Sequence, residues 1–221
     1  MPIHVDHEIR RLQLAQAVWR IVVRDGVTAA SVRAVAREAG LSMGSVRHFF
    51  ASHDQLLLFA VEALVEQARR RIEAGTPARM ALLAAGRPLA AVAALLEEVV
   101  PLDAERQTEA KVWAAFTTPP ATSPEVATIR EQVDDGVREL CRNALDALQQ
   151  FGRLHADRDR RIEIERIHAL LDGLAIHLTL EPGRLDSDLA RSVIRTHLGD
   201  LASTPSNDHP NVGGPNDRTA S

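Results

Sequence analysis

The sequence predicts an all-α protein with a small N-terminal domain and a larger C-terminal domain. Apolar residues recur at helical spacing along the chain, and no segment sustains the alternation of a half-buried strand. Glycine and proline stand mostly between these segments, where helices begin or end. A chain of 221 residues with 45% hydrophobic content can form one domain of average size and a smaller one. We place the N-terminal domain at residues 1–52 and the C-terminal domain at residues 53–201.

The first helix is predicted at about residues 6–24, and Asp25-Gly26 ends it. One stripe of this helix is apolar and should form the core of the small domain. The residues of the stripe are Ile9, Leu12, Ala15, Trp19 and Val22 or Val23.

Residues 31–50 predict two short helices around a sharp turn. Ser31 and Ser42 are suited to cap these helices, because a serine hydroxyl accepts from backbone N–H groups that otherwise lack partners. Gly40 stands where a helix needs a left-handed residue at its C-terminal end. Leu41 and Val46 have the spacing of a hydrophobic staple. Together these features predict a helix-turn-helix.

The outward side of the second short helix carries small or hydrogen-bonding side chains. A helix with such a first turn can enter the major groove of DNA, where its donors reach base edges and its positive end faces a phosphate. The alternative is an ordinary helical corner that binds nothing.

The run AGLSMGSVRHFFASHDQLL resembles the N-terminal DNA-binding domain of TetR-type (tetracycline-repressor family) transcriptional regulators, over about residues 8–64. Three positions depart from the family pattern. The family commonly has a lysine or other polar residue at Met43, a tyrosine at Arg47 and a lysine at His53; the tyrosine and the lysine at the last two positions usually contact phosphate. Arg47 is able to replace that contact or to reach a guanine edge. The candidate DNA-binding residues are Ser31, Arg33, Ser42, Met43, Gly44, Ser45, Arg47, His48, Phe49 and His53.

A capping box at residues 52–55 opens a helix that connects the two domains, at residues 53–75. Its arginine run, Arg69-Arg70-Arg71, is interpreted as a solvated face, and Gly75-Thr76-Pro77 interrupts the helix. Capping and breaking residues then set the later helices: Pro88 to Pro101, Asp103 to before Pro119, Ser123 to Gly152, about 160–180, and Asp186 to Leu201. The polar tail at residues 202–221 is predicted to be disordered.

The last two helices are apolar around more than one face, so they are either central or paired with another subunit. The phrase LLDGLAIHLTLEP, with Trp113 upstream, resembles the C-terminal domain of the betaine-regulator-like branch of the TetR type, over about residues 88–200. The resemblance implies a homodimer that forms through these two helices. The candidate interface residues are Leu170, Leu174, His177, Leu178, Val193, Ile194, His197 and Leu198.

Several side chains of the larger domain lie on faces able to point inward, where they either fill a core or line a cavity. The family resemblance favours a cavity, which in a helical bundle is a usual small-molecule site. Aromatic residues make up only 3% of the chain, which argues against a multi-ring cage for a quaternary ammonium ligand. The candidate pocket residues are Leu95, Val99, Trp113, Phe116, Val137, His168 and Asp172.

No complete catalytic or metal-binding pattern occurs in the sequence. Glu165 and His168 have the i, i+3 spacing of di-iron bundles, but such a site needs a second copy of the motif, and we find none. Cys141 is the single cysteine, lacks metal-ligand spacing and suits a reducing compartment. We therefore expect no enzyme, metal or cofactor.

Charge is distributed unevenly along the chain. The formal net charge is −4, whereas residues 1–60 contain seven arginines against five acidic residues. A basic N-terminal domain on an acidic body suits a DNA-binding regulator. No apolar run reaches the roughly 20 residues that a membrane span needs. We expect a cytoplasmic protein.

These observations predict a homodimeric TetR-type transcriptional regulator, interpreted as a repressor. It would bind a near-palindromic operator in double-stranded DNA and be released by a small-molecule effector. The same features fit an activator. Two rivals stay open: a ligand-binding module without DNA affinity, suggested by Met43, Arg47 and His53, and a helical-bundle enzyme.

Overall fold

The computed structural model describes residues 3–117, 123–181 and 183–202. Within these ranges the chain is helical apart from loops and one isolated bridge between Leu154 and Ala202, so the all-α prediction is confirmed. The α-helices are α1 (Ile3–Asp25), α2 (Val32–Glu38), α3 (Met43–Phe49), α4 (His53–Ala74), α5 (Thr76–Ala84), α6 (Pro88–Leu96), α7 (Ala104–Thr117), α8 (Pro124–Gln150), α9 (Arg160–Leu180) and α10 (Ser187–Leu201). Two 3₁₀ turns, η1 (Val27–Ala29) and η2 (Glu97–Val99), follow α1 and α6. The predicted disordered tail lies outside the described residues, except for Ala202.

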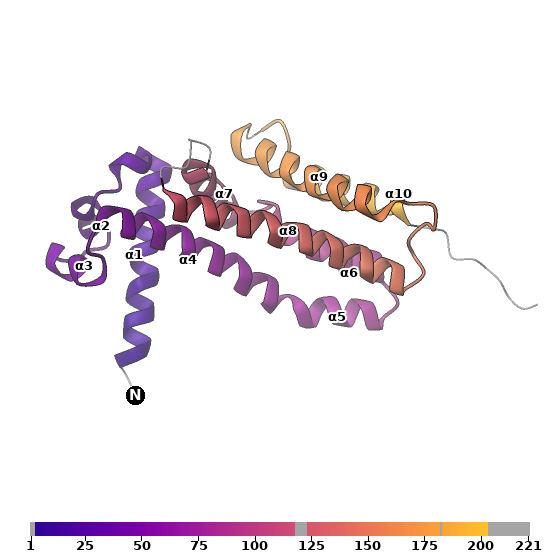
Figure 1. Cartoon of the computed structure of the whole chain (residues 1–221), viewed down its shortest axis with the longest axis horizontal. Coiled ribbons are helices and arrows are strands. Elements are labelled where there is room, and N and C mark those ends of the chain that lie inside the picture. Colours follow the sequence, from indigo (N-terminus) through magenta and orange to yellow (C-terminus); the bar gives the residue numbers. More distant parts are fainter. Residues whose placement is uncertain (1–2, 118–122, 182, 203–221) are drawn as a thin grey trace, which may run out of the picture.

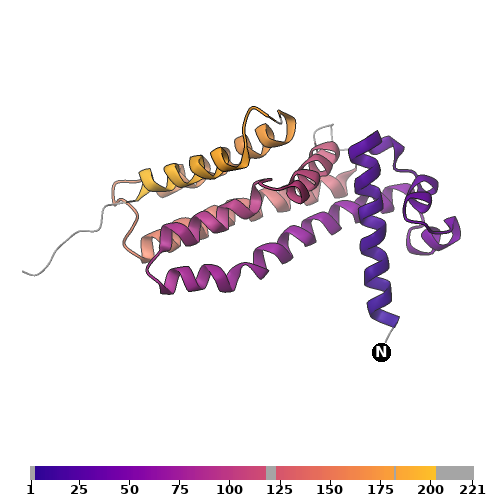
Figure 2. The ribbon, with the colours of Figure 1, turned by 180° about the vertical axis from the view of Figure 1, so that it is seen from behind.

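The molecule is elongated, with α1, α2 and α3 gathered at one end (Figure 1). Helix α4 leaves this end and runs along the body into α5, while α6 and α8 lie beside it. Helices α9 and α10 form the opposite side of the body, and Figure 2 shows the same arrangement from behind. No helix of the described residues is long and apolar enough to cross a membrane.

A small core holds the N-terminal end together. Trp19 is buried there, and its indole Nε1 donates a hydrogen bond to the carbonyl oxygen of Ala60 at 2.9 Å. This small core is not limited to residues 1–52, because the first half of α4 and Val112 of α7 belong to it. The α1 stripe was predicted correctly from Ala15 onward, but Ile9 and Leu12 are 52% and 45% exposed, since α1 extends beyond its neighbours.

A larger core lies between α6, α8, α9 and α10. Its buried members are aliphatic residues and Cys141. Burial raises the pKa of the Cys141 thiol to about 12, so the residue is an inert apolar side chain, as the sequence suggested.

Most helix boundaries were predicted correctly, since the side chains of Ser123, Asp159 and Asp186 cap α8, α9 and α10. The predicted end of the connecting helix at Gly75 is confirmed, but the helix that follows at once, α5, was not predicted. Gly75 has helical dihedral angles of −76° and −11°, and α5 begins at once with Pro77 in its first turn. Proline fits there because the first helical N–H groups have no intrahelical acceptor.

Candidate nucleic-acid interface

The turn between α2 and α3 is defined by three local features. The Ser31 hydroxyl accepts from the Ala34 N–H at 3.2 Å, and the Ser42 hydroxyl accepts from the Ser45 N–H at 3.1 Å. Gly40 has φ 67°, the left-handed conformation that glycine adopts without strain. The Gly40 and Leu41 N–H groups donate to the carbonyls of Arg37 and Ala36, as in a Schellman motif. The predicted helix-turn-helix is confirmed.

Helix α3 presents one side to the core and the other to solvent. Val46 is its buried member, and Phe49 packs partly against the small core. Ser42, Met43, Gly44, Arg47 and His48 are exposed, while Ser45 is half-buried. A Cβ on Gly44 would approach only the Ser42 hydroxyl, at 3.8 Å, so no other described atom crowds this position. This surface is open for a ligand as large as DNA.

The start of α4 lies next in the chain. The Ser52 hydroxyl accepts from the Gln55 N–H at 3.1 Å, and the Gln55 side chain accepts from the Ala51 N–H at 3.0 Å. His53 is half-buried, and its Nδ1 is buried with no hydrogen-bond partner among the described atoms. The imidazole therefore reaches less far into solvent than the family's lysine would.

The arginines of this end divide into paired and unpaired groups. Arg20 and Arg24 contact Glu38 at 2.8 and 3.2 Å and hold the pKa of that carboxyl below its usual range, so both stay occupied. Arg33, Arg37 and Arg47 are exposed and form no ion pair with the described residues. Positive charge is thus available on α2 and α3.

The predicted pocket residues are divided between the two cores, and a cavity shared by them stays a prediction. Leu95, Val99 and Val137 pack against the larger core, whereas Trp113 and Phe116 pack against the small core. His168 is buried on α9, with Nε2 3.4 Å from Asp134 and 3.8 Å from Asp172. Sequence periodicity gave the inward faces of these helices but not which core each face would join.

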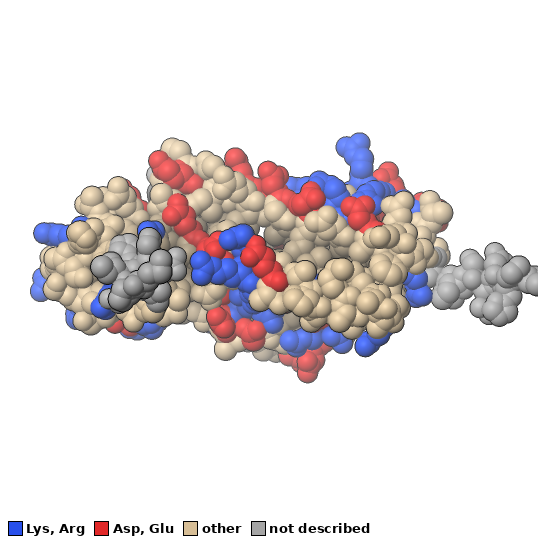
Figure 3. Space-filling view, turned by 90° about the horizontal axis from the view of Figure 1, so that it is seen from below, with Lys and Arg blue, Asp and Glu red and all other residues tan. Residues whose placement is uncertain are grey.

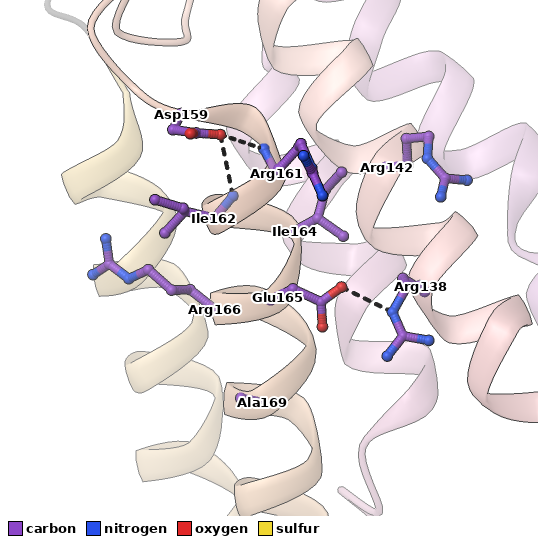
Figure 4. A pocket seen from close by; sticks show the side chains of 9 residues that line it. All are labelled: Arg138, Arg142, Asp159, Arg161, Ile162, Ile164, Glu165, Arg166 and Ala169. Atoms are coloured by element: carbon purple, nitrogen blue, oxygen red, sulfur yellow. Dashed lines mark hydrogen bonds and ion pairs between the residues drawn. The ribbon is translucent and has the colours of Figure 1, made fainter.

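A surface pocket of about 760 Å³ lies between α8 and α9 (Figure 4). Four arginines line it, and three of them have carboxylate partners: Arg138 with Glu165 at 2.9 Å, Arg166 with Glu163 at 3.0 Å, and Arg142 with Glu139. Ile162 and Ala169 form part of its apolar lining. This pocket was not predictable from the sequence, because no local motif marks a groove between two helices.

The predicted interface residues need correction. Leu174, Leu178, Ile194 and Leu198 are buried in the chain's own larger core, and Leu170 and Val193 pack partly against it. Side chains already buried cannot be covered by a second subunit. His197 is half-buried and His177 is exposed. The exposed large apolar side chains of these two helices are Ile162, Ile176 and Leu180 on α9 and Leu189 on α10.

Comparison with known proteins identifies the family. The family model described as the BetI-type transcriptional repressor, C-terminal, matches residues 88–203. The transcriptional regulator PksA of Bacillus subtilis is 38% identical over 198 residues, which cover 90% of this chain and 92% of that protein. The chain belongs to the TetR family of transcriptional regulators. The helix-turn-helix of this regulator is therefore the DNA-binding element of a known family.

Further relatives and solved structures agree with this assignment. A BetI regulator of Chromohalobacter salexigens is 31% identical over 87% of this regulator and 88% of that protein. The crystal structure of a transcriptional regulator from Rhodococcus sp. Rha1 aligns with a TM-score of 0.68 and 28% identity, over 86% of this chain and 95% of that one. A regulator from Saccharomonospora viridis, solved in complex with choline, has a TM-score of 0.71 over 90% of this chain and all of that one. At 21% identity, the latter supports the fold alone.

Proposed function

We propose that this regulator is a repressor that binds a near-palindromic operator as a homodimer and leaves it when a small molecule binds. The observation that carries the proposal is α3, whose first turn is exposed and lies near arginines that form no ion pair within the described part of the chain. In the bound state α3 would lie in the major groove, with the capped starts of α2 and α4 facing phosphates on either side.

Arg47 is the residue whose role is most open to test. It lies on the exposed side of α3 and replaces a tyrosine that usually contacts phosphate in the family. We therefore assign it a phosphate contact. Arg47→Ala should weaken binding evenly across single-base operator variants and reduce the slope of log affinity against log salt by about one unit. A loss confined to one base position would show a base contact instead.

The dimer surface is best assigned to the exposed side of α9. Ile162, Ala169 and Ile176 recur every seven residues, and Arg166, Gly173 and Leu180 follow each of them by four. Ile162, Ile176 and Leu180 are 57%, 56% and 66% exposed. This is the pattern of a helix that packs against another helix, and the small residues at its centre permit close approach. A second copy on this surface would also cover part of the pocket in Figure 4.

Light scattering of the full chain tests the dimer. Ile176→Glu should give a monomer and a steep loss of operator affinity, since both half-sites must be engaged together. Met80→Glu is the matched control, because Met80 is 57% exposed on α5, and it should remain a dimer. A wild-type monomer at micromolar concentration would refute this part of the proposal.

The effector is proposed to bind within the C-terminal domain. The buried part of the larger core contains no aromatic residue among the described side chains. These side chains therefore cannot form an aromatic cage around a quaternary ammonium ion. We therefore do not transfer choline from the Saccharomonospora viridis complex. A gel shift on the gene's own upstream DNA, repeated with candidate organic molecules, tests repression, release and the rival of a module without DNA affinity.

A further inference from the structure

The two halves of α4 are anchored by different forces. In the first half Leu56, Phe59, Ala60 and Leu64 are buried in the small core. Beyond Leu64 no side chain of α4 is buried, and Ile72 only packs partly against the larger core. The second half therefore has fewer apolar anchors than the first, and polar contacts add to them.

Glu109 of α7 receives two of these contacts. Its carboxylate accepts from Arg71 Nη1 and from Gln67 Nε2, both at 2.9 Å, and only 8% of its side chain is exposed. Gln67 also donates to Glu105 at 2.7 Å. A carboxylate so deeply buried needs a cation beside it, and Arg71 supplies the one within hydrogen-bonding distance.

Glu98 of η2 joins the same group from another direction. Its Oε2 lies 3.5 Å from Arg71 Nε and 3.7 Å from Arg106 Nη1, and Oε1 lies 4.0 Å from Arg79 Nη1. Arg106 in turn donates to the carbonyl of Glu97 at 2.8 Å. We call Gln67, Arg71, Glu98, Arg106 and Glu109 the Arg71 cluster. It joins α4, η2 and α7 at one point.

Helix α7 also reaches the DNA-binding end, because Val112, one turn beyond Glu109, is fully buried in the small core. A displacement of η2 or α7 within the C-terminal domain would therefore reach the second half of α4 through Arg71. The opposite end of α4 carries His53 and follows α3 directly. A change in the angle of α4 at Arg71 would therefore move the recognition helix.

We propose that Arg71 is a positioning residue for operator binding: its contacts with Glu98 and Glu109 fix the angle of α4 and so the separation of the two α3 helices in the dimer. The inference rests on the proposed function. It goes further by assigning the coupling between effector and operator binding to the Arg71 cluster. An effector that displaces η2 or α7 would break the contacts of Arg71 with Glu98 and Glu109.

The neighbouring arginines provide a matched control. Arg69 and Arg70 are 59% and 69% exposed and pair with Glu66 and Glu73 on the same helix. Such pairs cannot set the angle of α4 against another element. In Figure 3, which looks onto the α4–α5 side, acidic and basic side chains are intermixed midway along the body.

Operator binding by the full-length chain is the first test. Arg71→Ala should weaken specific binding about threefold to thirtyfold, the range of mutations that alter coupling between sites, while affinity for unrelated DNA stays constant. Arg69→Ala should bind like wild type. Arg71→Lys, which keeps a positive charge beside Glu98 and Glu109, should recover most of the loss. Equal affinities for Arg71→Ala and Arg69→Ala would overturn the proposal.

Hydrogen–deuterium exchange without DNA tests the cluster independently of DNA binding. Arg71→Ala should increase amide exchange at residues 65–74 and 104–112 and leave exchange around Trp19 unchanged. Arg69→Ala should not increase exchange at either segment. If Arg71→Ala is poorly folded, Glu98→Gln provides the same comparison with the carboxylate charge removed. Unchanged exchange in these segments would overturn the inference, whereas failure of wild type to bind its upstream DNA would count against the proposed function alone.

Discussion

The two cores of this regulator are built from different side chains. Six of the seven aromatic residues belong to the small core or pack against it, and the seventh, Phe151, is 40% exposed at the end of α8. Helices α2 and α3 have seven residues each, too short to be stable alone, so large aromatic surfaces must hold them. The larger core joins helices of up to 27 residues, for which interdigitating aliphatic side chains suffice. Helix length thus explains where the aromatic residues are needed.

The largest expected effect tests whether the two cores unfold together. Leu145 is fully buried in the larger core, so Leu145→Ala should lower the free energy of unfolding by about 2–5 kcal/mol. Because α4 and α7 contact both cores, urea transitions followed by tryptophan fluorescence and by circular dichroism should shift equally. Met80→Ala, at an exposed site, should change stability by less than about 0.5 kcal/mol. A fluorescence transition that stays in place while the other shifts would mean independent unfolding.

A smaller effect on stability is expected from replacing glycines, and it compares the α2–α3 turn with the middle of α8. Gly40→Ala forces an alanine into the left-handed region at φ 67° and should destabilise the protein by about 1–2 kcal/mol. Gly136→Ala, on the exposed side of α8 with open space around it, should stabilise by about 0.5–1 kcal/mol. Thermal unfolding measures both, and effects of the same sign would show that the α2–α3 turn tolerates a side chain.

The smallest expected effect is the contribution of His197 to the pH dependence of stability. Burial first, and the Arg166 guanidinium second, lower the pKa of His197, and its Nε2 is buried without a hydrogen-bond partner among the described atoms. The unfolded chain therefore takes up a proton more readily than the folded chain, so stability should fall as pH drops below about 6.5 and stay level above it. His197→Gln should reduce this fall in urea unfolding at pH 7.5 and pH 5.5. An unchanged pH dependence would rule out His197 as its source.

The sequence predicted what short-range chemistry decides. Caps at Ser31, Ser42 and Ser52 and the left-handed Gly40 depend on neighbours within a few residues, and all were found. Helix α5 was missed because Pro77 begins a helix as readily as it ends one. The family and its DNA-binding element were recognised from one contiguous run of residues.

What depends on neighbours far away in the chain was not predictable. Trp113 and Phe116 were placed on an inward face correctly, but the sequence did not show that this face packs against the small core. The arginine run was interpreted as solvated, which holds for Arg69 and Arg70 and fails for Arg71, whose partners lie 27 and 38 residues away. Helical periodicity identifies a buried face but not the element that buries it.

The position of Val112 limits how parts of this regulator can be exchanged. A hybrid that fused residues 1–75 to the sensing body of another regulator would leave the site of this side chain empty unless the new body supplied an equivalent helix. The small core of the N-terminal segment would then be poorly packed even in the absence of DNA. A functional hybrid therefore has to include α7 together with the N-terminal DNA-binding domain. Otherwise the second protein must have a helix that places a side chain of the same volume at the position of Val112.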